Sequence, residues 1–261
     1  MERLRGIKES LLMLLYPDHA VCMGCGDLAG TEEGWLCTEC MEQLEALSMQ
    51  DRHLCDRCGS PVRQGRRCRD CADWPDDGVQ IARYCYGYDH PVDEAVRQMK
   101  YTGVYRMTEW MGEKVAELLE QGAYGRTDLL VPVPMHPARM RERGRNHALC
   151  IAQEVSRVTG VPVWTGLRRI RNTKQQARLK GEVRKSAMAG AFSVDPKDAH
   201  ELIGKRIVLI DDVITTGATV NSCARALYAN GAACVCAAAF AGHLSAAENK
   251  DVQSGSKDYT K

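Results

Sequence analysis

Residues 207–230 form the segment that most restricts how this chain can fold. Residues 207–210 are a continuous apolar, largely β-branched run, which is typical of a parallel strand covered on both faces. Two acids, Asp211 and Asp212, follow it, and after a hydroxyl-rich turn residues 219–230 have helical spacing before Gly231. The sequence therefore predicts a strand, a tight turn and a helix in direct succession, as in α/β proteins.

The turn at residues 215–219 has the chemistry of a phosphate site. It lies where backbone N–H groups at a helix start and the positive end of the helix dipole favour an anion. Thr215, Thr216 and Thr219 add hydroxyl donors, and Gly217 permits a close approach of the backbone. The two preceding carboxylates cannot bind phosphate, so we expect them to accept hydrogen bonds from sugar hydroxyls. One ligand that needs both halves is a ribose 5-phosphate.

The segment resembles the phosphoribosyl pyrophosphate (PRPP) motif of type I phosphoribosyltransferases, in which a hydrophobic strand, two acids and a threonine- and glycine-rich loop follow in order. The resemblance implies that Asp211 and Asp212 contact the ribose hydroxyls and that magnesium arrives with the ligand. It assigns the 5-phosphate to Thr215, Thr216, Gly217, Ala218 and Thr219. The alternative is that the acids merely cap the helix, but a cap needs only one acid or hydroxyl.

Four C-x-x-C pairs in the first 71 residues indicate two zinc sites. Two pairs make one tetrahedral all-thiolate site, and Gly26 and Gly59 follow the first and third pairs, where glycine lets a knuckle point backbone N–H groups at sulfur. Four thiolates leave no open coordination position, so we expect structural ions. The predicted ligands are Cys22, Cys25, Cys37, Cys40, Cys55, Cys58, Cys68 and Cys71.

The order of the pairs is similar to a tandem zinc ribbon. The simplest assignment gives one ion to the first four cysteines and one to the last four, with an interleaved assignment open. Disulfides would require an export signal, and a redox motif would require one pair beside a βαβ unit. Apolar residues are few here, so we expect each metal to supply folding free energy on the order of 10 kcal/mol. The remaining thiols are expected to pack as small apolar groups: Cys85, Cys150, Cys223, Cys234 and Cys236.

Length and composition predict one globular domain with a small appended module. The chain has 261 residues, 44% of them hydrophobic. We expect a short helix at 1–20, a double zinc ribbon at 21–75, the α/β domain at 80–242 and a disordered tail at 243–261. The apolar run at 11–15 is shorter than the roughly 18 residues of a bilayer span, which predicts neither a membrane helix nor a signal peptide. Thiols without an export signal predict a cytoplasmic protein.

Positive charge is concentrated between residues 139 and 185. This stretch has 13 Lys and Arg against three acids, a local charge of +10, and since the whole chain carries +1, the rest carries −9. Such a region favours a polyanionic ligand: pyrophosphate, a nucleotide or single-stranded nucleic acid. The alternative is a solvated basic face without a ligand.

Residues 128–134 predict a second strand, which ends in prolines and precedes an arginine-rich loop. A helix should follow, with an apolar face of Leu149, Ile151, Ala152, Val155 and Val158, and then a strand at 161–164. Ligands of open α/β sheets bind beyond the carboxyl ends of the strands, so both loops should face one crevice. Arginines there could bind pyrophosphate bidentately and absorb the charge that grows as it leaves.

Nearly the whole chain resembles the ComF family, phosphoribosyltransferase-like proteins linked to competence that also include GntX-type proteins. The resemblance implies a type I phosphoribosyltransferase-like fold, a parallel sheet flanked by helices, behind an N-terminal tandem zinc ribbon. Two positions depart from the family pattern, Arg145 and Ala187. The matching pieces, besides the knuckles and the PRPP motif, are residues 86–88, 96–101 and 131–134, Arg139, Arg143, Gly144, Asn146, Thr173, Gln176, Leu179, Arg184, Ala191 and Phe192.

By carry-over, Lys100, Arg139 and Arg143 are candidates for the pyrophosphate side of the site. Lys100 could instead lay its stem beside Tyr101 at a helix end. Thr173, Gln176 and Arg184 fall where related enzymes keep a mobile lid and hood, in which packing competes with substrate contact. His136 and His147 could act as bases, although loop histidines are usually just solvated.

These observations predict a cytoplasmic, PRPP-binding ComF-type protein that supports DNA uptake in natural competence. One alternative is an active phosphoribosyltransferase, in which an unidentified nitrogenous base displaces pyrophosphate from the ribose. Positioning and electrostatics could carry that reaction without a protein nucleophile. Another alternative is a zinc-ribbon adaptor for a DNA-translocating motor or channel. Besides PRPP, single-stranded DNA and such a motor or channel protein are the candidate partners.

Overall fold

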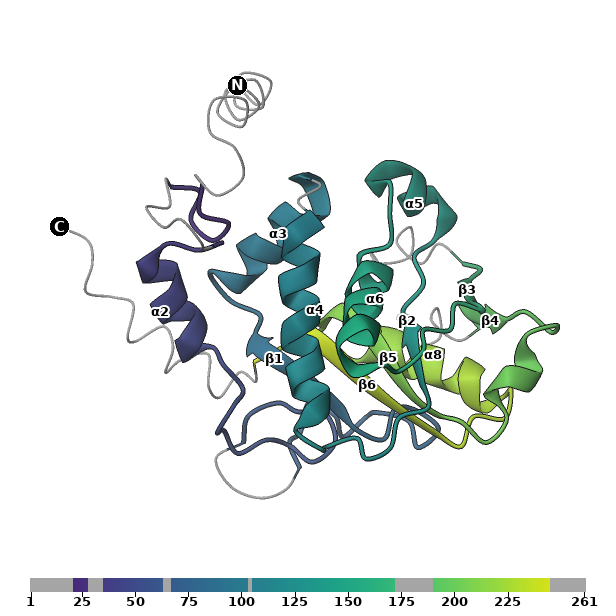
Figure 1. Ribbon diagram of the computed structural model, residues 1–261. Helices are drawn as coiled ribbons and strands as arrows, with labels where there is room; N and C mark the ends of the chain where they lie inside the picture. The colour runs from purple at the N-terminus through teal and green to yellow at the C-terminus, as the bar shows by residue number, and fades with distance from the viewer. Residues whose placement is uncertain (1–20, 28–34, 63–66, 103–104, 172–189, 245–261) are drawn as a thin grey trace. The chain divides into compact units, whose positions relative to one another are not determined.

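A computed structural model describes residues 21–27, 35–62, 67–102, 105–171 and 190–244 (Figure 1). The chain divides into two compact units. The small unit comprises residues 1–48 and 89–103, and the sheet unit comprises residues 49–88 and 104–261. The predicted short helix at 1–20, most of the predicted tail, and Thr173, Gln176 and Arg184 lie outside the described residues. Among the described residues, no helix is both long and apolar enough to cross a bilayer.

A four-stranded, all-parallel sheet forms the centre of the sheet unit. Its strands are β1 (Ala82–Gly87), β2 (Leu129–Pro132), β5 (Arg206–Ile214) and β6 (Cys234–Gly242), in the order β1-β6-β5-β2. Every residue of β6 is buried, and its many small side chains, four of the nine being alanine, allow helices to approach both faces.

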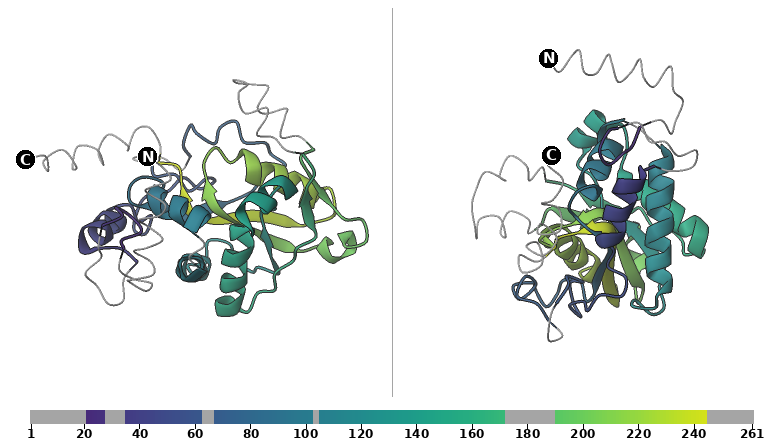
Figure 2. Two further views of the ribbon diagram at one scale, coloured as in Figure 1. Left: turned by 90° about the horizontal axis from the view of Figure 1, so that it is seen from above. Right: turned by 90° about the vertical axis from the view of Figure 1, so that its left-hand side faces the viewer.

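Helices cover both faces of this sheet (Figures 1 and 2). On one face α4 (Tyr105–Glu120) and α6 (His147–Thr159) pack against each other and against the strands, and α8 (Ala218–Tyr228) covers the other face. The core of α6 consists of His147, Ala148, Ile151, Ala152 and Val155. The arrangement is that of a doubly covered parallel sheet, as the apolar strands predict.

Two expectations for α6 and the segment that follows it are wrong. Val158 is 43% exposed, because it lies near the end of the helix and off the buried face. The expected strand at 161–164 is reduced to one parallel bridge between Val163 and Leu130. In place of a longer edge strand, the chain continues into an antiparallel pair, β3 (Leu167–Arg169) and β4 (Phe192–Val194), and a short 3-10 helix, η1 (Ala199–Leu202).

The small unit contains α2 (Thr38–Ala46) and α3 (Val92–Thr102). Cys40 and Leu44 form the buried face of α2. A Cβ on Gly24 would lie 2.6 Å from Pro91 and 2.8 Å from the sulfur of Cys40, so the first knuckle packs closely on both. Residues 49–75 belong to the sheet unit, whereas residues 89–103 belong to the small unit together with the first four cysteines.

Candidate functional site

The β5–α8 turn has the geometry of an anion site. Strand β5 ends at Ile214, Thr215 and Thr216 are exposed, and Gly217 occupies the N-cap of α8 at φ 73°. Such a left-handed backbone is tolerated by glycine at little cost. The hydroxyl of Thr216 accepts a hydrogen bond from the N–H of Ala218 at 3.5 Å. The N-cap residue, Gly217, has no side chain that could cap the helix. The turn thus presents hydroxyls and a helix N-terminus together.

Asp211 and Asp212 lie in β5, where both are half-buried. The Asp211 carboxylate accepts a hydrogen bond from the N–H of Asp212 at 2.9 Å. Successive strand residues point to opposite faces, so the two carboxylates leave β5 on opposite sides. Burial is the main cause that raises the pKa of the Cys223 thiol in α8, and the charge of Asp211 adds to it.

Arg169 is a candidate that the sequence argument missed. It belongs to β3, and burial lowers the pKa of its guanidinium, an effect that the charge of Asp211 opposes. The guanidinium also lies 5.5 Å from the ring centre of Phe192 in β4. Strand β3 pairs with β4, and β4 packs against α8, so the place of this arginine depends on tertiary contacts that no local signal marks.

Arginines reach the same edge of the sheet through α5 (Pro137–Arg143), a helix that the sequence argument treated as a loop. The signals for α5 were present: Pro137 at its first turn, and Gly144 in the left-handed conformation after its end. Strands β2 and β5 are parallel neighbours with Pro132 opposite Ile210, so the segments that follow them leave from the same edge.

Arg139 and Arg143 are half-buried on α5, and Arg141 is exposed. His136 caps this helix by accepting a hydrogen bond from the N–H of Ala138 at 3.2 Å, and His147 is buried in the core of α6. Lys100 is half-buried in α3 of the small unit, which the structure does not place relative to the turn.

The first four cysteines gather into one cluster in the small unit, with all four sulfurs within 4.8 Å of one another. Thiolates around zinc at about 2.3 Å would stand about 3.8 Å apart, and the sulfurs of Cys25 and Cys37 are 3.8 Å apart. Burial raises the pKa of the Cys22 thiol, but backbone N–H groups of Cys25, Cys37 and Gly24 outweigh it and lower the pKa to about 7. These residues fit a thiolate-bound zinc.

The last four cysteines gather in the same way in the sheet unit. The sulfurs of Cys55 and Cys71 are 3.6 Å apart, and the N–H of Cys68 donates to the Cys55 sulfur at 3.3 Å. Burial opposes ionisation of Cys55, yet backbone N–H groups of Cys58, Cys68 and Arg57 lower its pKa to about 6. Within the described residues the grouping is sequential: the first four cysteines form one cluster and the last four form the other.

The other five cysteines behave mainly as apolar groups. Cys223, Cys234 and Cys236 are buried, while Cys85 and Cys150 are half-buried. Burial raises the pKa of the Cys236 thiol to about 12 and that of Cys85 further.

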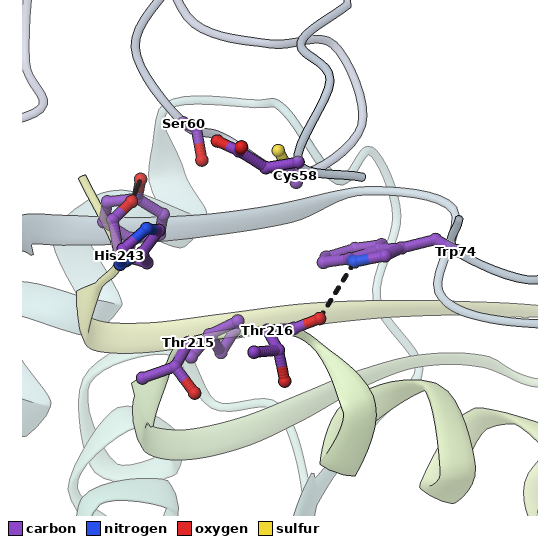
Figure 3. Close-up of a pocket in the computed structure, with 9 residues that line it drawn as sticks. Cys58, Ser60, Trp74, Thr215, Thr216 and His243 are labelled. Atoms are coloured by element: carbon purple, nitrogen blue, oxygen red, sulfur yellow. Dashed lines mark hydrogen bonds between the residues drawn. The ribbon is translucent and has the colours of Figure 1, made fainter. Parts of the chain in front are cut away.

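A cavity of about 250 Å³ separates the second cysteine cluster from the β5–α8 turn (Figure 3). Cys58, Ser60 and Trp74 line it on the ribbon side. Thr215 and Thr216 line it from the turn, but Figure 3 shows their hydroxyls directed away from Ser60 and Trp74. The cavity therefore lies behind the turn, on the side opposite the hydroxyls.

Comparisons with known proteins match both parts of the chain. A double zinc ribbon domain matches residues 11–72, and a phosphoribosyl transferase domain matches residues 146–258. Together with the parallel sheet flanked by helices and the two cysteine clusters, these matches confirm the predicted fold class.

Two relatives align over most of their length. Competence protein ComFC of Bacillus subtilis is 28% identical over 85% of this chain and 83% of its own. DNA utilization protein YhgH of Salmonella typhi is 28% identical over 85% of this chain and 96% of its own. Among solved structures, the B. subtilis glutamine PRPP amidotransferase complexed with ADP and GMP is 20% identical, with a TM-score of 0.35, over 50% of this chain and 26% of that chain.

Proposed function

Because this chain belongs to the ComF family, we propose that it binds PRPP at the β5–α8 turn and supports the uptake of DNA in natural competence. The observation that carries the proposal is the turn itself. Exposed Thr215 and Thr216 precede a left-handed Gly217 at the start of α8. Hydroxyls, backbone N–H groups and the helix dipole there favour the 5-phosphate.

The ribose and the pyrophosphate of the ligand would each meet side chains of complementary chemistry. Asp211 and Asp212 would accept hydrogen bonds from the ribose hydroxyls. Magnesium would neutralise part of the pyrophosphate, and Arg139 and Arg143 would approach it from α5. In this assignment the chain positions the ligand and supplies electrostatic complementarity.

Calorimetry with PRPP and magnesium tests the site. We expect saturable binding to wild type and at least about a tenfold loss for the double variant Asp211→Asn, Asp212→Asn, which removes two charges at constant size. Asp198→Asn, an acid just before η1 of the same unit, serves as the control and should bind like wild type. Flat traces for wild type would contradict the proposal.

The relatives named for competence and DNA utilization, with the basic α5, favour single-stranded DNA as a second ligand. Arg139, Arg141, Arg143 and Arg145 place four positive charges on and beside α5. Binding should weaken steeply with salt, as counterion release requires. Neutralising the four arginines should abolish DNA binding, whereas the double Asn variant should retain it. Equal binding by the neutralised variant would contradict this assignment.

Catalysis and location extend the proposal. An active transferase would release pyrophosphate when a nitrogenous base is supplied, so a panel of bases with a pyrophosphate assay decides whether turnover occurs. An adaptor role would appear as capture of a DNA-translocating motor or channel protein by the full chain, lost when the first cysteine cluster is disrupted. Eight zinc-ligating thiols suit the reducing cytoplasm, where we place the protein.

A further inference from the structure

Residues 74–79, which follow the second cysteine cluster, contact one face of α8; we call them the clamp segment. The contacts fall on Gly217, Asn221 and Arg225. Spacings of four residues place these positions above one another on a helix. The clamp segment therefore contacts α8 from its N-cap to its last turn.

The contact at the N-cap is the closest. The indole N–H of Trp74 donates a hydrogen bond to the carbonyl of Thr216 at 3.0 Å. A Cβ on Gly217 would lie 2.2 Å from the Trp74 ring, so the ring rests directly on the backbone of the turn. Trp74 is 9% exposed. The turn that we assign to the phosphate is thus held from behind by one aromatic side chain.

Two further contacts align the rest of α8. The Asn221 side-chain oxygen accepts a hydrogen bond from the N–H of Val79 at 2.9 Å, and Asn221 is buried. A Cβ on Gly78 would lie 2.1 Å from that oxygen, which fixes the approach. Nearer the end of the helix, Arg225 forms an exposed ion pair with Asp77 at 2.8 Å.

Arg57 joins the clamp segment to the second cysteine cluster. It lies between Cys55 and Cys58 of the knuckle, and its guanidinium donates to the carbonyls of Trp74 at 3.0 Å, of Pro75, and of Val79 at 3.5 Å. The guanidinium also lies 5.8 Å from the centre of the Trp74 ring. The N–H of Trp74 donates to the carbonyl of Cys71 at 3.1 Å. Both halves of the cluster therefore hold Trp74.

The cavity beside the turn makes the contact between Trp74 and Gly217 more important. The rear of the turn at Thr215 and Thr216 borders the space of about 250 Å³ described above instead of packed side chains. Without Trp74, Gly217 would border an enlarged void, and the turn could relax into it.

We propose that the second cysteine cluster is a positioning device for the phosphate turn: through Arg57 and Trp74 it holds Gly217 and the start of α8 in the conformation that receives the anion. The proposal rests on the proposed PRPP site. It assigns Trp74 and Arg57 as positioning residues, since Trp74 acts through the backbone of the turn, Arg57 acts through Trp74, and neither needs to touch the ligand.

Trp74→Phe and Trp74→Ala test the contact in the full-length protein. The phenylalanine variant keeps a ring but loses the N–H donor, and we expect about fivefold weaker PRPP binding, the equivalent of one hydrogen bond. The alanine variant also loses the packing and should bind at least about tenfold more weakly. Trp35→Phe, beside the first cluster in the small unit, is the matched control and should leave the affinity unchanged.

Hydrogen exchange supplies a measurement that needs no ligand. The N–H of Asn221 donates to the carbonyl of Gly217 at 2.9 Å, so its exchange reports whether the start of α8 opens. We expect faster exchange at Asn221 in both Trp74 variants and in Arg57→Gln, while the core of β6 keeps wild-type protection. Two zincs per chain must be retained in the Arg57 variant, which keeps the cluster itself intact.

The outcomes separate the two proposals. Wild-type affinity and wild-type exchange in Trp74→Phe, Trp74→Ala and Arg57→Gln would refute the positioning role while leaving the PRPP site untouched. If wild type does not bind PRPP, the proposed function fails, and exchange at Asn221 alone decides whether the cluster holds the turn. Faster exchange throughout the sheet unit would also count against the proposal, because it would indicate general destabilisation.

Discussion

The two cysteine clusters have the same ligands and the same knuckle chemistry, but they stabilise different parts of the chain. The first closes on α2 and packs on Pro91 within the small unit. The second, through Arg57 and Trp74, contacts the N-cap of α8 in the sheet unit. Repetition of a metal-binding motif therefore does not imply repetition of its structural role, which depends on what the residues after the last ligand contact.

The largest expected difference comes from removing one ligand in each cluster. Cys68→Ser should release the second zinc, lower the melting temperature of the sheet unit and abolish measurable PRPP binding, because a structural zinc contributes on the order of 10 kcal/mol of folding free energy. Cys37→Ser should release the first zinc and leave PRPP affinity within about threefold of wild type.

Zinc content, thermal unfolding and calorimetry on both variants make this comparison. Each variant should retain one zinc per chain, which shows that the remaining cluster is intact. Equal losses of PRPP affinity would mean that the clusters do not differ in the way we describe. The same would hold if the Cys37 variant lost more than the Cys68 variant.

The glycine under Trp74 should give the next largest effect. Gly217→Ala adds a Cβ at 2.2 Å from the ring and places alanine at φ 73°. We expect about 1–2 kcal/mol of backbone strain and about 1–3 kcal/mol of overpacking. Gly160→Ala, at φ 72° with nothing within 4 Å of its Cβ, should show the strain alone. Chemical denaturation of both variants measures the difference. Equal destabilisation would show that the Trp74 ring moves away from the added Cβ without a cost in free energy.

The sequence predicted individual elements and metal-binding motifs, but it did not predict the long-range contacts that join them. The run at 207–210 gave β5, the spacing of the next segment gave α8, and the C-x-x-C pairs gave two clusters. Each of these depends on periodicity or on residues a few positions apart. β5 runs on through Asp211 and Asp212, which apolar content could not foresee.

The clamp segment shows why the rest was hidden. Trp74 is separated from Thr216 by 142 positions, and Val79 from Asn221 by the same number. No periodic pattern within either segment specifies that pairing. The place of Arg169 likewise depends on tertiary contacts, since β3 pairs with β4 and β4 packs against α8. Sequence reasoning located the groups that could bind a ligand, whereas their supports require the tertiary structure.

Along the face of α8 that contacts the clamp segment, the loss of unfolding free energy should decrease from Asn221 to Arg225. Asn221→Leu leaves the buried N–H of Val79 without its acceptor, which should cost about 1–3 kcal/mol of unfolding free energy. Arg225→Ala removes an ion pair whose side chains are 44% and 62% exposed, so less than about 1 kcal/mol should be lost. Chemical denaturation of both variants tests which loss of unfolding free energy is larger. A larger loss from Arg225→Ala would show that the clamp segment stabilises mainly the last turn of α8 and not its first half.

The smallest effect on ligand binding should come from the opposite end of β5. There the Asp128 carboxylate accepts hydrogen bonds from the N–H of Arg206 at 2.9 Å and from the Arg126 side chain at 2.8 Å. The first of these contacts is the main cause that lowers the pKa of Asp128 below its ordinary 3.8. Since the unfolded chain binds this proton more tightly, the contribution of Asp128 to stability is full above pH 3.8 and is lost as the pH falls through the lower folded value.

Asp128→Asn should therefore be less stable than wild type at neutral pH, and the difference should shrink on acidification below pH 3.8. Its PRPP affinity at neutral pH should equal that of wild type, because Asp128 precedes β2 and lies at the amino end of the strand pair, away from the turn. Denaturation across the acid range and calorimetry at pH 7 measure both. If Asp128→Asn weakened PRPP binding as much as Trp74→Phe, binding would follow the stability of the whole sheet unit, and the distinction between the two clusters would lose its basis.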